Sequence, residues 1–550
     1  MTDWSTVADP DAGVELFFGY RDEQAYAACV EQLVADGVAS RIADQDPTVW
    51  GDEAREEAAR RLSWVDLADS SRPLVATVEQ LRTRLHGQGV DHVVLCGMGG
   101  SSLAPEVLCA AAGVELAVLD SSDPDYVRAA MADRLEQTVV VVSSKSGSTV
   151  ETDSQRRAYE RAFRDAGIDP AERIVVVTDP GSPLDGEARE AGYTVVNADP
   201  DVGGRYSALT AFGLVPSGLA GVDLTALLDQ AAAVRVGLGV DFADNPALRL
   251  GGLLGLAATQ GVDKLVLADA GSPFPGFGDW AEQLVAESTG KGGHGLLPIV
   301  VEGTDAPNLD PSTADSVLVT YGPRFVFDSV RPASGWGATV DAPLGAQLLL
   351  WEFAVAVAGR VIGINPFDQP DVESAKGAAR GMLDQQSDPE PPLFSDGSVE
   401  VHATPGLLDG ADQSVAGAVE ALLGQLDPDA GYLAVMAYLD RAADAALAQV
   451  RPALARRTGR PVTFGWGPRF LHSTGQYHKG GPATGVYLQV TTQPHQDLEV
   501  PGRPFTFGEF IAAQAAGDGQ VLADHGRPVL RLHLRDHDTG LAQVRAALDS

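Results

Sequence analysis

The chain has 550 residues, 45% of them hydrophobic and 21% charged, and this length exceeds what one hydrophobic core serves, so two to four domains are expected. Its formal net charge of -37 argues against nucleic acid or an anionic membrane as the main partner, because both attract basic surfaces. Three cysteines, Cys29, Cys96 and Cys109, are too few for a disulfide framework and indicate a reducing compartment.

Two stretches of the chain carry the pattern of an α/β protein. Residues 1–90 first predict a helical N-terminal segment, because apolar residues recur at helical spacing in AYAACVEQLVADGVA and LVATVEQLRTRLHG. Over residues 91–215, short apolar runs then alternate with turns and helices, as in a doubly wound parallel sheet. The pattern restarts over residues 216–384. The predicted fold class is therefore α/β, with two doubly wound parallel-sheet domains.

The remainder of the chain predicts a linker and a third region. Residues 385–398, QQSDPEPPLFSDGS, are rich in Pro, Asp and Ser and predict the linker, and residues 400–550 predict a C-terminal α+β region. The longest apolar stretch, residues 345–364, contains Glu352 and Arg360, which disfavours a membrane span. The N-terminus also lacks the features of a signal peptide, so a cytoplasmic location is expected.

Two strand-turn-helix units predict an anion site. Backbone N–H groups at a helix start, together with the helix dipole, favour a phosphate, although a capped helix start without a ligand is the alternative. The first unit spans residues 97–103 and the second residues 144–152. The candidate ligand-binding residues on these turns are Gly99, Gly100, Ser101, Ser144, Lys145, Ser146, Ser148 and Thr149.

A predicted helix, WAEQLVAEST, carries Gln283 and Glu287 one turn apart, so the amide and the carboxylate share one face. This arrangement suits proton transfer, although an exposed helix with an ordinary glutamate is the simpler interpretation of this stretch alone. The turn GGRYS presents Arg205, whose planar guanidinium could stabilise a developing oxyanion. Taken alone, that turn is more typical of the surface.

Further candidate groups lie nearer the C-terminus. The segment PFDQPDVESAK places Gln369 and Lys376 two helical turns apart, so both could face one cleft. The glycine-containing loop GPRFLHSTGQYHKGGP carries His472 and His478, and a histidine pKa near working pH suits acid-base chemistry. A metal site at these two histidines is disfavoured, because no neighbouring cysteine or carboxylate completes a ligand set.

Five motifs lie in order over residues 90–380: GMGGSSLAP, SSKSGSTVET, GGRYSALTAFG, EQLVAESTGK and NPFDQPDVESAK. Together they resemble the phosphoglucose isomerase family, which is built on two sugar-isomerase (SIS) domains, and in particular its actinobacterial form, found also in transaldolase-isomerase fusions. The resemblance implies interconversion of glucose 6-phosphate and fructose 6-phosphate by ring opening and a cis-enediol, with no cofactor and no metal, in a homodimer or a monomer. A non-catalytic phosphosugar-binding regulator, or an isomerase of mannose phosphate or an aminosugar phosphate, remains an alternative.

The resemblance also implies a role for each matching residue. Glu287 would move a proton between carbons 1 and 2, Arg205 would stabilise the cis-enediolate, and Lys376 would assist ring opening. The serine- and threonine-rich turn would hold the phosphate. Gln283 and Gln369 would orient the sugar hydroxyls.

The departure from the family pattern concerns the histidine that opens the sugar ring. The family places it between the glutamate helix and the lysine segment, where this chain offers only His294. We therefore expect His472 to open the ring, with His478 as the second candidate. This assignment implies a rearranged C-terminal region.

Overall fold

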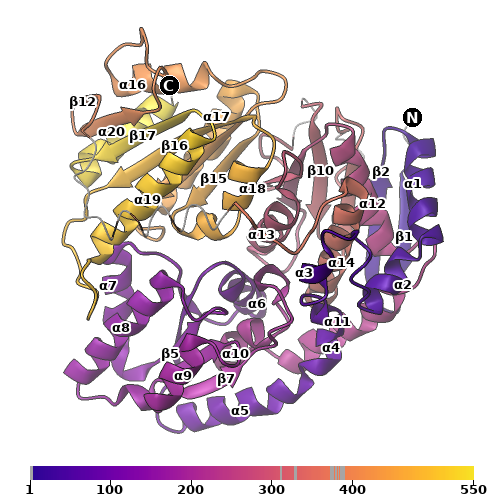
Figure 1. Cartoon of the computed structure of the whole chain (residues 1–550), viewed down its shortest axis with the longest axis horizontal. Helices are drawn as coiled ribbons and strands as arrows, with labels where there is room; N and C mark the ends of the chain where they lie inside the picture. Colours follow the sequence, from indigo (N-terminus) through magenta and orange to yellow (C-terminus); the bar gives the residue numbers. More distant parts are fainter. Residues whose placement is uncertain are drawn as a thin grey trace.

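The computed structural model describes residues 4–309, 313–327, 331–371, 377, 381, 383 and 391–549. Within these residues the chain forms three units, each built around one β-sheet (Figure 1). The first two units are the α/β pair that the sequence predicts. The third is formed by the C-terminal region.

The first unit has a parallel five-stranded sheet in the order β4-β3-β5-β6-β7. Its strands are β3 (His92–Gly97), β4 (Ala117–Leu119), β5 (Thr138–Ser143), β6 (Ile174–Thr178) and β7 (Thr194–Asn197). Its helices are α5 (Arg72–His86), α6 (Leu103–Ala112), α7 (Pro124–Ala132), α8 (Val150–Asp165), α9 (Pro183–Glu190) and α10 (Ala211–Ala220). On β5, Val139 and Val141 join the core shared with α5 and α10, while Val140 packs with Tyr159 and Phe163 of α8. Burial on both faces explains the unbroken valine run of this strand.

The second unit has a six-stranded sheet in the order β1-β2-β11-β10-β8-β9. Its strands are β1 (Ser5–Asp9), β2 (Val14–Gly19), β8 (Lys264–Asp269), β9 (Leu297–Val301), β10 (Ser316–Tyr321) and β11 (Gly337–Asp341). Its helices are α1 (Glu23–Ala35), α11 (Leu224–Leu238), α12 (Pro246–Thr259), α13 (Phe277–Thr289) and α14 (Leu344–Ile362). Short helices α2 (Val38–Ala43), α3 (Arg55–Ala58) and α4 (Leu67–Ser70) lead from α1 to the first unit.

The N-terminal segment differs from the prediction, because residues 5–19 form a β-hairpin rather than a helix. Strand β2 pairs antiparallel with β11, and its alternate residues Leu16 and Phe18 are fully buried. The segment is too short for its alternating pattern to stand out in the sequence. Its strand conformation is selected by the edge of β11, which is far away in the chain.

Helix α14 is long and apolar enough to cross a membrane by length and composition. However, 83% of its most apolar run of residues is buried inside the protein. It packs along α12, where a Cβ on Gly251 would lie 2.4 Å from the carbonyl oxygen of Ala354. A Cβ on Gly255 would lie 2.5 Å from the Cβ of Val361. These close approaches explain the two glycines, and burial in the core explains the apolar surface of the helix.

The third unit has a six-stranded sheet in the order β12-β13-β17-β16-β14-β15. Its strands are β12 (Phe394–Asp396), β13 (Val399–Ala403), β14 (Tyr432–Tyr438), β15 (Val462–Trp466), β16 (Gly485–Thr492) and β17 (Val529–Leu534). Its helices are α16 (Val415–Leu423), α17 (Val450–Thr458), α18 (Gly475–Gly480), α19 (Phe507–Asp524) and α20 (His537–Asp549). Strands β14 to β17 are parallel, so this region is a third α/β unit with an antiparallel edge rather than an α+β extension. Strand β12 lies within the stretch predicted as a linker, part of which is outside the described residues.

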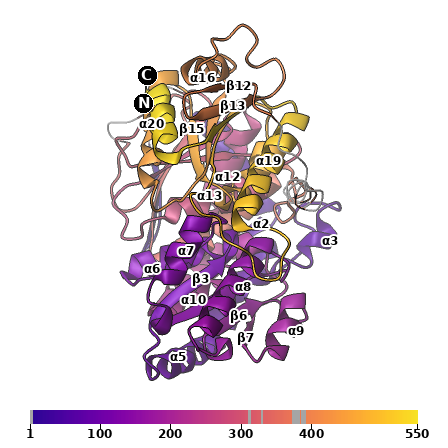
Figure 2. The same cartoon turned by 90° about the vertical axis from the view of Figure 1, so that its left-hand side faces the viewer.

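Helix α13 lies where the three units meet, since it contacts α14, α6 of the first unit and α18 of the third (Figure 1). Both views place the third unit directly against the first, beside α7 and α8 (Figure 2). Ion pairs join the two units: Arg469 contacts the buried Asp120 at 2.5 Å and Glu106 at 2.6 Å. Candidate groups from all three units can therefore converge around one helix.

Candidate active site

Helix α13 carries the predicted amide and carboxylate side by side. Gln283 and Glu287 are only 4% and 8% exposed, and the Gln283 Nε2 donates to Glu287 Oε2 at 3.3 Å. The simpler interpretation, an exposed helix with an ordinary glutamate, is therefore wrong. A largely buried carboxylate held by an amide on a rigid helix is suited to proton transfer.

Arg205 lies opposite this carboxylate. It is 4% exposed, and its Nη1 lies 3.6 Å from Glu287 Oε2. Its Nε donates to Ser288 Oγ at 2.9 Å, and its Nη1 donates to Gln369 Oε1 at 2.7 Å. Two backbone carbonyls of the loop that carries Gln369 accept from its Nη2. The guanidinium is thus fixed in place, with charge available for an oxyanion beside Glu287.

Lys291, just beyond α13, braces the same loop. Its Nζ contacts Asp368 Oδ1 at 2.7 Å and accepting carbonyls of the loop at 2.8 and 2.6 Å. Burial, with Arg205 nearby, lowers the pKa of Lys291 to about 8. No role is predicted for this lysine from the sequence, although its position in the glycine-rich segment after the helix was a usable signal. Lys376, the predicted ring-opening aid, lies outside the described residues.

Two adjacent glycines allow close approaches at the site, Gly100 within the first unit and Gly99 between the three units. A Cβ on Gly100 would lie 1.9 Å from the carbonyl oxygen of Gly204, so no other residue fits against the turn that presents Arg205. Gly99 has a φ of +56°, and a Cβ there would lie 2.8 Å from Gln283 Nε2 and 2.8 Å from the His472 carbonyl oxygen. The first turn of the predicted anion site, which also contains the half-buried Ser101, therefore contacts both the glutamate helix and the histidine loop.

The second turn of the predicted anion site precedes α8. The buried Ser144 donates through Oγ to Thr149 Oγ1 at 3.0 Å, and the exposed Ser146 and Ser148 have their Oγ atoms 2.9 Å apart. Thr149 is the N-cap of α8 but makes no side-chain capping bond. Hydroxyl groups thus surround a helix start whose first N–H groups point outward, which is an arrangement suited to phosphate.

Lys145 of this turn is already paired. Its Nζ contacts Asp179 Oδ2 at 2.7 Å and the carbonyl oxygen of Pro200 at 3.1 Å. Burial lowers the pKa of Lys145, partly offset by Asp179. Its contact with a phosphate stays a prediction, since binding there requires the ammonium to share or leave Asp179.

The structure separates the two histidine candidates. His472 ends a 3₁₀ turn, Arg469–His472, and its Nε2 lies 3.2 Å from Glu151 Oε1. Glu151 is the second residue of α8, directly after the anion turn, and it also accepts from Gln514 Nε2 at 2.7 Å. Glu151 is not among the predicted site residues, although the motif SSKSGSTVET has a carboxylate at that helix start.

His478 lies instead in the interior of the third unit. Its Nδ1 is 3.0 Å from the Tyr432 hydroxyl, and its ring stacks on that tyrosine. Burial, with Lys479 and Arg527 nearby, holds the pKa of His478 well below its usual range. A neutral, enclosed imidazole fits a packing role, so His472 is the histidine that we retain for the candidate site.

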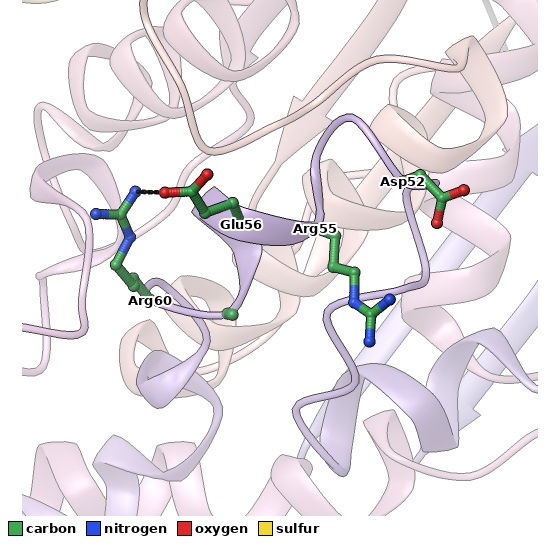
Figure 3. Close-up of a pocket in the computed structure, with 5 residues that line it drawn as sticks. Asp52, Arg55, Glu56 and Arg60 are labelled. Atoms are coloured by element: carbon green, nitrogen blue, oxygen red, sulfur yellow. Dashed lines mark hydrogen bonds and ion pairs between the residues drawn. The ribbon is translucent and has the colours of Figure 1, made fainter.

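A separate surface hollow lies at α3 (Figure 3). It is lined by Asp52, Arg55, Glu56, Ala59 and Arg60. All five are exposed, and Arg60 pairs with Glu56 at 3.4 Å. None of the residues that converge around α13 lines this hollow.

The α/β units of this chain meet at a buried carboxylate, a fixed guanidinium and a hydroxyl-rich helix start. Such a site is typical of α/β proteins that bind and transform a small phosphorylated molecule. A family model described as phosphoglucose isomerase matches residues 74–246. The chain belongs to the phosphoglucose isomerase family.

The alignments with relatives of this chain cover most of each relative's length. A probable glucose-6-phosphate isomerase of Natronomonas pharaonis is 28% identical over 399 residues, which cover 64% of this chain and 92% of the relative. The glucose-6-phosphate isomerase of Thermosynechococcus vestitus is 29% identical over 425 residues, covering 63% and 78%. The crystal structure of a glucose-6-phosphate isomerase from Chlamydia trachomatis shares the fold with a TM-score of 0.54 at 20% identity, covering 70% of this chain and 90% of that one.

Proposed function

We propose that this chain is an aldose-ketose isomerase that interconverts glucose 6-phosphate and fructose 6-phosphate. The observation that carries the proposal is the buried pair of Glu287 and Arg205, 3.6 Å apart, at the junction of the three units. Relatives named glucose-6-phosphate isomerase support the choice of substrate. A regulator that only binds a phosphosugar fits less well, because binding alone needs no buried carboxylate beside a fixed guanidinium.

In this proposal the phosphate is bound at the start of α8 and its hydroxyl-rich turn. His472, oriented by Glu151, opens the sugar ring by moving a proton between the anomeric hydroxyl and the ring oxygen. Glu287 then removes the proton from carbon 2 of the open aldose, which leaves a cis-enediolate. Returning that proton to carbon 1, while the hydroxyl proton on the carbon 2 oxygen passes to the carbon 1 oxygen, leaves a carbonyl at carbon 2 and gives the ketose.

Arg205 faces the charge that develops on the enediolate oxygens. Because its guanidinium is already held by Ser288 and by the loop of Gln369, little reorganisation is needed when this charge appears. Removal of one such preorganised donor commonly lowers turnover by about 10²–10³. Gln283, next to Glu287, and Gln369, next to Arg205, are placed to orient sugar hydroxyls.

The site is proposed to be complete within one chain. Glu287, Arg205 and His472 come from three different units of the same chain, and the backbone of His472 is held against Gly99. A partner subunit is then not needed to supply the histidine.

The test of the proposed function is a coupled assay on the Glu287→Gln variant. Gln keeps the shape of the side chain but cannot take the proton, so turnover of both sugar phosphates should fall by about 10³ or more while sugar-phosphate binding stays within a few-fold. Glu31→Gln, an exposed change on α1, is the control and should be unaffected. Retained turnover in Glu287→Gln would contradict the role, and a wild type that binds but does not convert either sugar would favour the regulator. Parallel assays with mannose 6-phosphate and aminosugar phosphates test the other substrates.

A further inference from the structure

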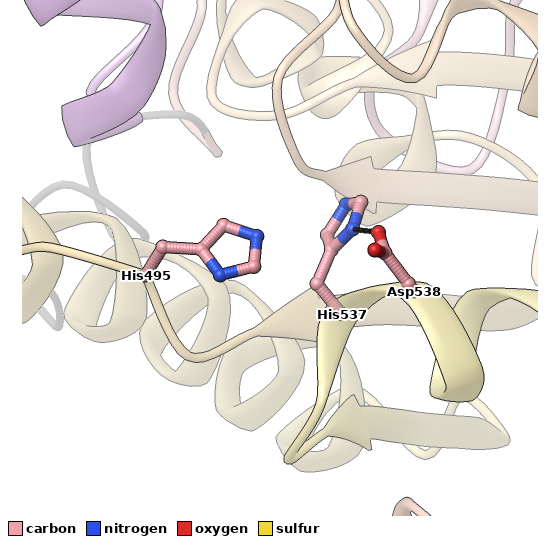
Figure 4. Close-up of side chains that lie close together, drawn as sticks. All are labelled: His495, His537 and Asp538. Carbon is pink, nitrogen blue, oxygen red and sulfur yellow. Dashed lines mark hydrogen bonds and ion pairs between the residues drawn. The ribbon is translucent and has the colours of Figure 1, made fainter.

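Two histidines and an aspartate that are not among the candidate active-site residues come together on the third unit (Figure 4). His495 follows β16, while His537 and Asp538 begin α20. Each offers one ligand atom, and these atoms lie within 4.8 Å of one another. The two imidazole rings are 5.5 Å apart between centroids. Segments about forty residues apart in the chain thus present metal-ligand groups to one point.

The His537 ring is oriented by carboxylates on both sides. Its Nδ1 lies 3.0 Å from Asp538 Oδ1, and its Nε2 lies 3.0 Å from Asp444 Oδ2. Asp444 is buried, and it comes from the loop after β14. Histidines that bind metals usually donate their second ring N–H to a carboxylate, which fixes the tautomer and raises the basicity of the ligating nitrogen. Asp444 occupies that position toward His537.

We propose that His495, His537 and Asp538 form a Zn²⁺ site. The ligands would be one ring nitrogen of His495, Nδ1 of His537 and a carboxylate oxygen of Asp538, with Asp444 accepting from Nε2 of His537. Two imidazoles and a carboxylate suit this borderline ion, and water can complete a tetrahedral set. Zn–ligand bonds of about 2.0–2.1 Å place tetrahedral ligands about 3.4 Å apart. The exposed His495 ring can close the remaining distance by rotating about its side-chain bonds.

A second group of one histidine and two carboxylates is less suited to a metal ion. His92 lies near Glu115 and Asp133, but Arg134 makes ion pairs with both carboxylates. The guanidinium therefore already occupies the place of a cation, and binding a metal there would require its displacement. In contrast, the carboxylates of Asp444 and Asp538 contact the His537 ring itself.

Bound Zn²⁺ would join the end of β16 to the start of the last helix. Helix α20 packs on α16 and α17, which cover the sheet of the third unit. An ion that holds α20 in place would stabilise this unit against unfolding, because metal binding to the folded state alone adds to its stability. The site does not touch the residues assigned to isomerisation, so its loss leaves the proposed activity unchanged.

Calorimetric titration of the full-length, chelator-treated chain with Zn²⁺ tests the proposal. We expect one ion per chain and a higher Tm with Zn²⁺. His495→Ala should weaken binding at least tenfold, and Asp444→Asn about 10–100-fold. His525→Ala, an exposed histidine change in the same unit, is the control and should bind as the wild type.

His495 is exposed, so its variant is expected to fold, and circular dichroism with the isomerase assay checks this. The proposal is overturned if the wild type binds no stoichiometric Zn²⁺. It is also overturned if His495→Ala and His537→Ala both bind Zn²⁺ as tightly as His525→Ala.

Discussion

At the scale of single residues, the candidate site depends on charges fixed before a substrate arrives. Arg205 is held by Ser288 Oγ and by the Gln369 loop, and its Nη1 forms an ion pair with Glu287 Oε2 at 3.6 Å, a distance longer than a hydrogen bond. The guanidinium therefore keeps hydrogen-bonding capacity for an oxyanion. The planar arrangement of the Arg205 donors, more than the charge of Arg205, is the property to test.

Arg205→Lys keeps the charge but removes the planar fork of donors. We expect kcat to fall by about 10²–10³ with a smaller change in KM, because the lost interaction belongs mainly to the enediolate. Arg161→Lys, on the exposed side of α8, is the matched control. Steady-state kinetics of the two variants decide the matter, and a change confined to KM would argue against an enediolate contact.

At the scale of elements, close approaches between backbones set the site. The turn at Gly100 lies against the turn that presents Arg205. The start of one helix in the first unit therefore fixes the position of Arg205, a candidate catalytic residue of the same unit. Helix α14 is packed equally tightly against α12 and contains Glu352, which is fully buried and has no hydrogen-bond partner within the described part of the chain. Each feature predicts a distinct result.

Gly100→Ala places a methyl group 1.9 Å from the Gly204 carbonyl oxygen, so one of the two turns must move. We expect a loss of about 1–3 kcal/mol in the free energy of unfolding and a large loss of activity. Gly186→Ala, in helix α9 with open space around its Cβ, should instead be neutral or stabilising by up to about 1 kcal/mol. Denaturant unfolding and the isomerase assay measure both, and equal behaviour of the two variants would refute the steric argument.

Burial raises the pKa of Glu352 well above its usual range, so the folded chain keeps this carboxyl protonated. The unfolded chain ionises it above about pH 4.3, and the stability contributed by the protonated group is lost as the pH rises toward its folded-state pKa. Glu352→Gln removes this dependence. Relative to the variant, the wild type should lose up to about 1.4 kcal/mol per pH unit between pH 5 and 8. Urea unfolding at both pH values tests this, and parallel pH profiles would contradict it.

At the scale of the whole molecule, the third unit brings His472 next to the candidate site residues of the other two units. Arg469, three residues before His472, is anchored to Asp120 of the first unit, and α18 packs on α13. The close approach of these elements within one chain is the basis for proposing a complete site per chain.

Mixing two inactive variants tests this organisation. Glu287→Gln and His472→Ala, each inactive alone, should remain inactive when unfolded together and refolded as a mixture, because no chain has both groups. If subunits exchanged the histidine, mixed dimers would recover about a quarter of the wild-type sites. Recovered turnover in the mixture would overturn the single-chain site, and refolded wild type is the control.

The chemical groups and the two parallel α/β units could be predicted from the amino-acid sequence alone. Alternation of apolar runs with turns is a local pattern, and the spacing of Gln283 and Glu287 requires only that the segment be helical. The anion turn before α8 is likewise local, because a helix start creates its own N–H groups. For such features the neighbouring residues in the chain are also the neighbours in space.

Which distant groups meet became known from the three-dimensional structure. It placed His472 beside Gly99 and His478 against Tyr432, a difference that a shared glycine-rich loop does not encode, and this placement is why His472 is the proposed ring-opening group. It also turned residues 5–19 into a hairpin and made the C-terminal region a third parallel unit. The physical reason is the same in each case: burial, strand pairing and the orientation of a titratable group depend on partners that lie tens to hundreds of residues away, which no local pattern contains.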